Sequence, residues 1–194
     1  MLERVLAPYN VPFYTQRTTD FRAEGYFSEE EALYWQPRGC GIASLRMIID
    51  GIRTSQGKNC VEPQGTMIYK GLERHAYVEE LGWIHRGLVD LAKDYDIEGE
   101  SHRKASVEDV IQAINHGMLC MASVSVLFNQ EKRGGHLIVV KGYETENGKV
   151  CNLIVNHPSS NEKYNWENYS VSLEHFRNSF SGAFMSFSAI KQQQ

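Results

Sequence analysis

A cysteine flanked by two glycines, Cys40, stands directly before a long apolar run in the segment GCGIASLRMIID. A structural cysteine normally lies within an apolar segment, where it packs as a small hydrophobe. At the start of a helix, by contrast, unpaired N–H groups point at the sulfur and lower the pKa of the thiol. Glycines on both sides leave room for a substrate backbone to approach. The position of Cys40 therefore predicts a nucleophile.

A nucleophilic cysteine needs an imidazole, and the imidazole needs a group that orients it. His136 follows two glycines and opens the apolar pattern HLIVVKGY, which predicts a place at the edge of a sheet. Asn156 ends the next strand pattern, in LIVNHP, and no aspartate lies on that strand. We therefore expect Cys40, His136 and Asn156 to form a catalytic triad that transfers an acyl group through a thioester.

The other cysteines and histidines are expected to be structural or solvated. Cys60, Cys120 and Cys151 show no short Cys/His spacing that suggests zinc, so we expect buried or loop thiols. His157 should face away from its neighbour Asn156 on the same strand and is interpreted as structural. Solvated faces are expected for the remaining five histidines: His75, His85, His102, His116 and His175. The sequence predicts neither a metal nor a cofactor.

The elements that position these residues follow from periodicity. Apolar residues at helical spacing after Cys40 predict a mostly buried helix that Gly51 ends. Further helices are expected after the capping residues Ser28, Ser106 and Ser172, and over part of 77–97. Loop is expected over 52–76, and a short strand is conceivable at VPFY. Longer strand patterns cover 118–128, 136–144, 150–158 and 182–190, with a turn at Asn147-Gly148.

Helices followed by mostly antiparallel strands indicate an α+β fold with helices on one side of a sheet. The chain has 194 residues, which suits a single domain with one core. A net charge of −4 without a basic patch predicts no nucleic-acid or membrane partner. No signal peptide or membrane-spanning stretch is recognisable, so we expect a cytoplasmic protein with reduced cysteines. The oligomeric state stays unknown.

Several motifs resemble those of the papain-like cysteine peptidases, most closely the double-glycine leader peptidases that process bacteriocins and their stand-alone relatives. The similar segments occur in the correct order over most of the chain: VPFYTQ, GCGIASLRMI, AINHGMLCMASVSV, GGHLIVVKGYE, LIVNHP and SLEHFRNSFSGAFMSF. The resemblance implies one papain-like domain over 1–194. In it, 1–76 would contain the nucleophile helix and loops, 77–117 helices, and 118–190 the sheet half.

Carried over by position, the resemblance makes Cys40 the nucleophile, His136 the general base and Asn156 the orienting residue. Two features depart from the family pattern. This branch usually has aspartate where Asn156 stands. It also places an oxyanion-stabilising glutamine six residues before the cysteine, where this chain has Tyr34. Gln36 and Gln16 are the alternatives for completing an oxyanion hole that the backbone N–H of Cys40 begins.

The resemblance favours hydrolysis of a peptide or amide bond. The same chemistry with an amine as acceptor would give an amide-forming acyltransferase, which takes an acyl group from a carrier-protein thioester in a biosynthetic pathway. A non-catalytic peptide-binding module is the second alternative, as in family members that lack the cysteine. We therefore expect the partner to be a peptide or an acyl-carrier-bound substrate.

Overall fold

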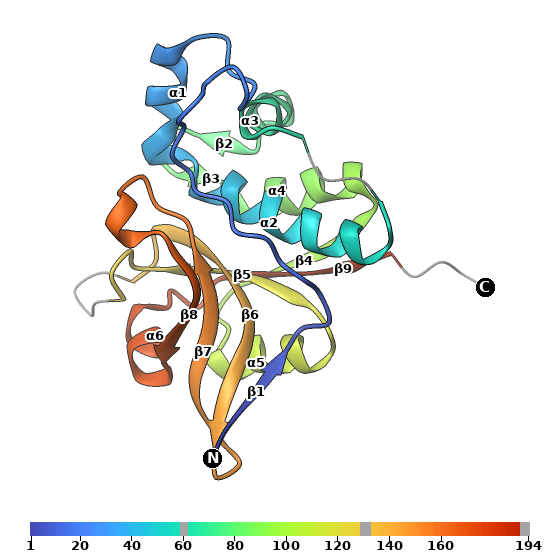
Figure 1. Cartoon of the computed structure of the whole chain (residues 1–194), viewed down its shortest axis with the longest axis vertical. Helices are drawn as coiled ribbons and strands as arrows, with labels where there is room; N and C mark the ends of the chain where they lie inside the picture. Colours follow the sequence, from blue (N-terminus) through green and yellow to red (C-terminus); the bar gives the residue numbers. More distant parts are fainter. Residues whose placement is uncertain (59–61, 129–132, 191–194) are drawn as a thin grey trace.

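The computed structural model describes residues 1–58, 62–128 and 133–190. It confirms the α+β class, with helices packed on a mostly antiparallel sheet (Figure 1). The helices are α1 (Glu29–Trp35), α2 (Cys40–Ser55), α3 (Gln64–Glu73), α4 (His85–Ala92), α5 (Val107–Asn115) and α6 (Leu173–Ser179), with short 3-10 turns η1 (Gln36–Arg38), η2 (Lys93–Tyr95) and η3 (Glu162–Tyr164). The strands are β1 (Leu2–Leu6), β2 (Tyr77–Val78), β3 (Gly82–Trp83), β4 (Ile97–His102), β5 (Leu119–Val124), β6 (His136–Glu146), β7 (Lys149–His157), β8 (Trp166–Ser172) and β9 (Phe184–Ala189).

The main sheet has seven strands in the order β4-β9-β5-β6-β7-β8, and β1 joins it by pairing with β6. All of these pairings are antiparallel. The first half of β6 pairs with β5, and its second half pairs with β1. The long strand β6, which begins at His136, therefore lies at the centre of the sheet.

Helices cover both faces of this sheet, whereas the sequence predicted helices on one side. Leu137 and Val139 of β6 pack into the core shared with α2, α3 and α4. Ile138 and Val140 of the same strand face a second core, closed by α5 and α6. Alternate residues of a strand point to opposite faces, so β6 contributes to both cores. Figure 1 shows α2 and α4 above the sheet and α5 and α6 below it.

The predicted helix starts agree with the structure. The side chains of Ser28, Ser106 and Ser172 each accept a hydrogen bond from a backbone N–H in the first turn of the helix that follows. Ser106 forms a complete capping box with Asp109. These bonds satisfy N–H groups that have no partner within the helix.

Other expectations differ from the structure. The helix after Cys40 continues through Gly51 to Ser55. Helix α3 occupies part of the expected loop at 52–76, VPFY is not a strand, and β1, β4 and β8 were not predicted. Within 77–97, a short β2–β3 hairpin precedes the helix, and its turn needs the positive φ of 78° at Gly82.

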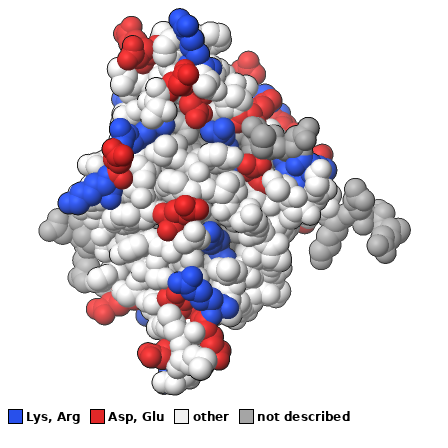
Figure 2. All heavy atoms as spheres, viewed as in Figure 1, with Lys and Arg blue, Asp and Glu red and all other residues white. Residues whose placement is uncertain are grey.

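Charged side chains of both signs are interspersed on the face shown in Figure 2. This mixture agrees with the small net charge of the chain. Across 1–58, 62–128 and 133–190, no helix combines the length and apolar character needed to cross a bilayer.

Candidate active site

The Cys40 thiol lies at the wall of a cavity of about 310 Å³. Cys40 is the first residue of the 16-residue helix α2, and its side chain is partly exposed. The cavity is also lined by residues of four other segments, among them Arg38, Trp83, His85, Ser123 and Leu137. A nucleophile placed here is open to a ligand and still lies beside the protein core.

The first turn of α2 lies against an unpaired stretch of β6. Strand β7 pairs with β6 only from Val139 onward, which leaves the backbone of Leu137 free on that edge. The N–H of Leu137 is directed at the Cys40 sulfur, and its carbonyl accepts a 3.0 Å hydrogen bond from the Ser44 hydroxyl. The helix thus takes the place that a neighbouring strand would occupy, and this places Cys40 beside the start of β6.

The thiol of Cys40 is subject to two opposing effects. Burial raises its pKa, because a thiolate loses solvation there. Backbone N–H groups of Leu137, Gly41 and Cys40 itself lower the pKa, but the net shift is upward. The thiol is therefore protonated at neutral pH in this arrangement and needs a base.

The backbone of His136 lies close to Cys40, but the His136 ring lies on the opposite face of the sheet. The ring is 5% exposed and packs on His157, with a centroid distance of 4.5 Å. The backbone carbonyl of Pro158 accepts a hydrogen bond from the His136 ring, and the ring nitrogen Nε2 has no partner. Burial first, and then His157, lower the pKa of His136 to about 3. His136 is thus neutral, and no hydrogen bond between its ring and the Cys40 sulfur occurs in the described structure.

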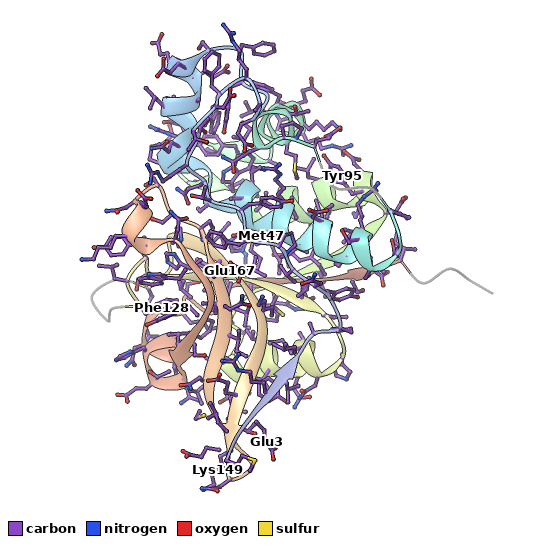
Figure 3. The ribbon with its side chains drawn as sticks, viewed as in Figure 1. Glu3, Met47, Tyr95, Phe128, Lys149 and Glu167 are labelled. Atoms are coloured by element: carbon purple, nitrogen blue, oxygen red, sulfur yellow. The ribbon has the colours of Figure 1, made fainter. Side chains whose placement is uncertain are left out.

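Asn156 is not brought to His136. Its amide nitrogen donates to the Pro12 carbonyl at 3.2 Å and lies 3.7 Å from the Met47 sulfur. Its oxygen accepts the N–H of Asn168 at 2.9 Å. Met47 belongs to α2, on the side of the sheet away from Phe128 and α6 (Figure 3). These bonds connect β7 to the N-terminal segment and to β8.

The register of the β6–β7 hairpin explains this separation. Asn147 and Gly148 form a two-residue turn with φ of 51° and 74°, so that Glu146 pairs with Lys149. One irregularity lies between Glu144 and Thr145, and a second lies between Val140 and Gly142. The second reverses the shift of the first, and Asn156 pairs with Val139. Since Val139 and His136 are an odd number of residues apart, Asn156 and His136 point to opposite faces.

The structure brings Gln16 and Gln36 together next to the cysteine. The Gln16 amide donates to the Gln36 carbonyl at 2.9 Å, and the Gln36 side-chain oxygen accepts the N–H of Thr18 at 3.3 Å. Gln16 is buried against Gly39, and its own side-chain oxygen has no partner. That oxygen can only accept a hydrogen bond, so any donor from Gln16 is its amide nitrogen, which carries two N–H groups and donates one of them to Gln36.

The glycines around Cys40 make room for protein side chains, whereas the sequence suggested that they admit a substrate. A Cβ atom at Gly41 would lie 2.7 Å from the Trp83 ring. A Cβ atom at Gly39 would lie 3.2 Å from the Gln16 side chain. The first turn of α2 can therefore approach Trp83 and Gln16 closely because both positions that flank Cys40 lack a side chain.

His85 is a cavity residue that sequence reasoning assigned to a solvated face. It is the first residue of α4 and lines the same cavity as Cys40. Burial, and then the Arg103 charge, lower its pKa. The sequence predicts a helix over this part of the chain, whereas Gly82 and Trp83 form the short strand β3 just before His85.

The remaining thiols have structural surroundings. Cys120 is buried, with its sulfur 3.9 Å from the Val110 carbonyl, and Cys151 lies 3.4 Å from the Glu144 carbonyl. Cys60 lies outside the described residues. Within the described ranges, no group of three or more His, Cys, Asp or Glu residues is arranged to hold a metal ion.

Comparisons with known proteins extend over nearly the whole chain. The model of the Peptidase_C39 like family matches residues 8–189. A solved C39-like peptidase from Bacillus anthracis is 16% identical, with a TM-score of 0.61 over 99% of this chain and 100% of that one. A double glycine motif protease from an AMS/PCAT transporter, solved in complex with the leader peptide, is 18% identical, with a TM-score of 0.52 over 95% of this chain and 94% of that one. No curated protein matches the chain.

At these identities, the two solved structures establish a shared fold. They confirm the expected papain-like α+β architecture, with helices packed on a mostly antiparallel sheet. Because the family match spans residues 8–189, the chain belongs to the Peptidase_C39 like family, the group of cysteine peptidases that its motifs resemble.

Proposed function

We propose that this protein is a cysteine peptidase in which Cys40 is the nucleophile. The observation that carries the proposal is the position of the Cys40 sulfur. It lies at the start of the 16-residue helix α2, at the wall of a 310 Å³ cavity, with backbone N–H groups directed at it. Such groups stabilise a thiolate once a base removes the proton.

In the proposed reaction, the Cys40 sulfur attacks the carbonyl carbon of a peptide bond, and a C–S bond forms. His136 takes the thiol proton and gives it to the leaving amine as the C–N bond breaks. Water then attacks the thioester, which releases the acid and restores the thiol. The backbone N–H of Cys40 and the amide of Gln16 are the proposed donors to the oxyanion, with Gln36 as the alternative.

This role requires the His136 ring to turn from the His157 face of β6 toward Cys40. Two features support such a rotation. The sulfur already lies beside the peptide group that follows His136. Gly134 and Gly135 precede His136, with φ of 75° and 91°, and allow backbone conformations that other residues rarely adopt. Asn156, whose amide is bonded elsewhere, is assigned a structural role in this proposal.

A peptide is the proposed substrate, because the double glycine motif protease with the same fold was solved with a leader peptide. To test the reaction, a peptide library is incubated with the wild type, with Cys40→Ala and with Cys151→Ala, and new amino termini are identified by mass spectrometry. We expect cleavage by the wild type and by the Cys151→Ala control, and none by Cys40→Ala. Cleavage by Cys40→Ala would contradict the proposal.

The same assay separates hydrolysis from transfer. Millimolar amine is added, and the acyl product is analysed as free acid or as amide. Free acid alone is expected of a peptidase. A product that becomes mainly amide would instead indicate the acyltransferase alternative, and the absence of any product together with tight peptide binding would indicate a binding module.

A further inference from the structure

His157 is fully buried, and both of its ring nitrogens are anchored to the backbone. Nδ1 lies 2.8 Å from the Tyr164 carbonyl, and Nε2 lies 2.9 Å from the Val126 carbonyl. These carbonyls belong to two separate segments, η3 and the chain that leaves β5. A ring held at both ends by different segments has one orientation available to it.

The anchored His157 ring packs against the His136 ring. Trp166 and Phe128 surround His157, with ring centroids at 4.8 and 5.8 Å, and His136 lies at 4.5 Å. His157 provides the only aromatic ring contact of His136 within the described residues. We propose that His157 holds the His136 ring in a resting orientation, on the face of β6 away from Cys40, so that the ring must leave His157 before it can act on the thiol. This inference rests on the proposed function, in which His136 is the base.

The hydrogen-bond partners determine which ring binds a proton first. A neutral imidazole can donate through one nitrogen only, so one of the two carbonyls at His157 then faces a lone pair. A protonated His157 satisfies both carbonyls. His136 has a backbone partner at Pro158 and none at Nε2. As the pH falls, His157 therefore takes the first proton, and its charge opposes protonation of His136.

Burial has the largest effect on the pKa of His136, and His157 is the titratable neighbour that adds to it. Burial lowers the pKa of both histidines, and the Tyr164 and Val126 carbonyls partly restore the pKa of His157. Within the part of the chain that the structure describes, His157 is the only titratable side chain that shifts the pKa of His136. The other neighbours of the pair, Phe128 and Trp166, carry no charge.

The test is a titration of the histidine ring signals by NMR, with His157→Gln as the variant and His175→Gln as the control. His175 is exposed on α6, away from the pair. In the wild type, His136 should titrate below His157. In His157→Gln, the His136 midpoint should rise by at least about one pH unit, whereas the control should leave it unchanged. An unchanged midpoint in a folded His157→Gln protein would overturn the proposal.

A second measurement follows the effect to Cys40. A His136 ring that is free to turn and to hold a proton lowers the thiol pKa, and each unit of pKa is about a tenfold change in thiolate at pH 6. Alkylation of Cys40 at pH 6 should therefore accelerate several-fold in His157→Gln, without a change at Cys151. An unchanged rate at Cys40, or equal acceleration at both cysteines, would count against positioning by His157.

The wild-type titration keeps the proposal testable if His157→Gln does not fold. A wild-type His136 that titrates above His157 would refute it without any variant. His157→Phe is a second variant, which retains the aromatic packing and removes the carbonyl bonds. None of these readouts depends on turnover, so an inactive protein with the expected titration would contradict the proposed peptidase and leave the role of His157 standing.

Discussion

The reactivity of the Cys40 thiol depends on the groups that contact its sulfur atom. Burial raises its pKa, and the N–H groups of Leu137, Gly41 and Cys40 compensate only in part. A thiol in this state reacts slowly until an imidazole approaches. The fold therefore directs backbone N–H groups at the sulfur, and the proposed reaction still needs an imidazole to remove the thiol proton.

Replacement of Cys40 by alanine should remove activity and leave stability nearly unchanged. The change deletes one partly exposed sulfur atom, so the free energy of unfolding should move by less than about 1 kcal/mol. Loss of a nucleophile typically lowers kcat by a factor on the order of 10⁴–10⁶. Peptide cleavage and urea denaturation measure the two effects, with Cys151→Ala as the control. A large loss of stability together with retained turnover would contradict the assignment.

Gln16 should matter more for the reaction rate than Gln36. The Gln16 side chain is buried beside Gly39, and its amide nitrogen carries a second N–H besides the one donated to the Gln36 carbonyl. The Gln36 side chain is less buried, and its oxygen accepts the N–H of Thr18. We expect Gln16→Ala to lower kcat/KM by about 10²–10³, as for the loss of one oxyanion donor, and Gln36→Ala to have a much smaller effect. Thermal denaturation of both variants separates catalysis from folding. Equal rates for the two variants would argue against Gln16.

The residue types around the site could be predicted from the sequence better than their directions. Cys40 and His136 stand out because each is a reactive residue directly before an apolar run. The first run forms a buried helix and the second forms a buried strand. The contact between His136 and His157 could not be predicted, since it depends on the face to which each strand residue points. Gly39 makes room for Gln16, and Gly41 makes room for Trp83. Each partner is distant in the sequence from its glycine, so these roles could not be predicted.

At the scale of elements, the β6–β7 hairpin decides which residues can meet. Its side chains alternate between faces, so a shift by one residue exchanges them all. The predicted Asn147-Gly148 turn is present, and so is an irregularity close to it. The second irregularity, near Lys141, restores the register and directs Asn156 toward α2. Such compensation has no signature in the alternation of apolar residues.

The contact between α2 and the β2–β3 hairpin can be tested with a double-mutant cycle. Gly41→Ala places a methyl group 2.7 Å from the Trp83 ring and should destabilise the fold by about 1–3 kcal/mol. In a Trp83→Ala background the same change should cost much less, because the obstructing ring is gone. Urea denaturation of the four proteins gives the coupling. Equal costs in both backgrounds would show that Trp83 does not restrict this position.

At the scale of the whole molecule, the buried histidine His136 makes stability depend on pH. Its pKa is about 3 in the folded protein, well below the usual value of 6.5. Between these values the unfolded chain binds more protons, so stability should be greatest above about pH 6.5 and fall as the pH decreases toward 3. The slope for one proton is about 1.4 kcal/mol per pH unit.

Urea denaturation at pH 7.5 and at pH 5 measures this slope. The loss of stability on acidification should be smaller in His136→Gln, which removes the titrating group, and unchanged in the His175→Gln control. If wild type and His136→Gln lose the same stability between these pH values, His136 is not buried in its neutral form. The account of the histidine pair would then be wrong at its starting point.

The overall architecture could be predicted to the level of its class. Capping serines and long apolar patterns identify α1, α2, α5, α6 and the central strands, because these elements carry local signals. Strand β1 is exposed at every residue, and β4 and β8 are partly exposed. None of the three shows a clear alternation of apolar residues, so these strands form through pairing with their neighbours. For the same reason, the helix cover on the second face of the sheet became apparent only with the tertiary structure.

The central claim is that Cys40 forms a covalent acyl intermediate with a peptide. The direct measurement is mass spectrometry of the intact protein, quenched with acid during turnover of a cleaved peptide and then mapped by proteolysis. We predict an acyl group on the Cys40 sulfur in the wild type and none in Cys40→Ala, with Cys120 and Cys151 unmodified in both. Cleavage that proceeds without an adduct on Cys40 in the wild type and continues in Cys40→Ala would contradict the account.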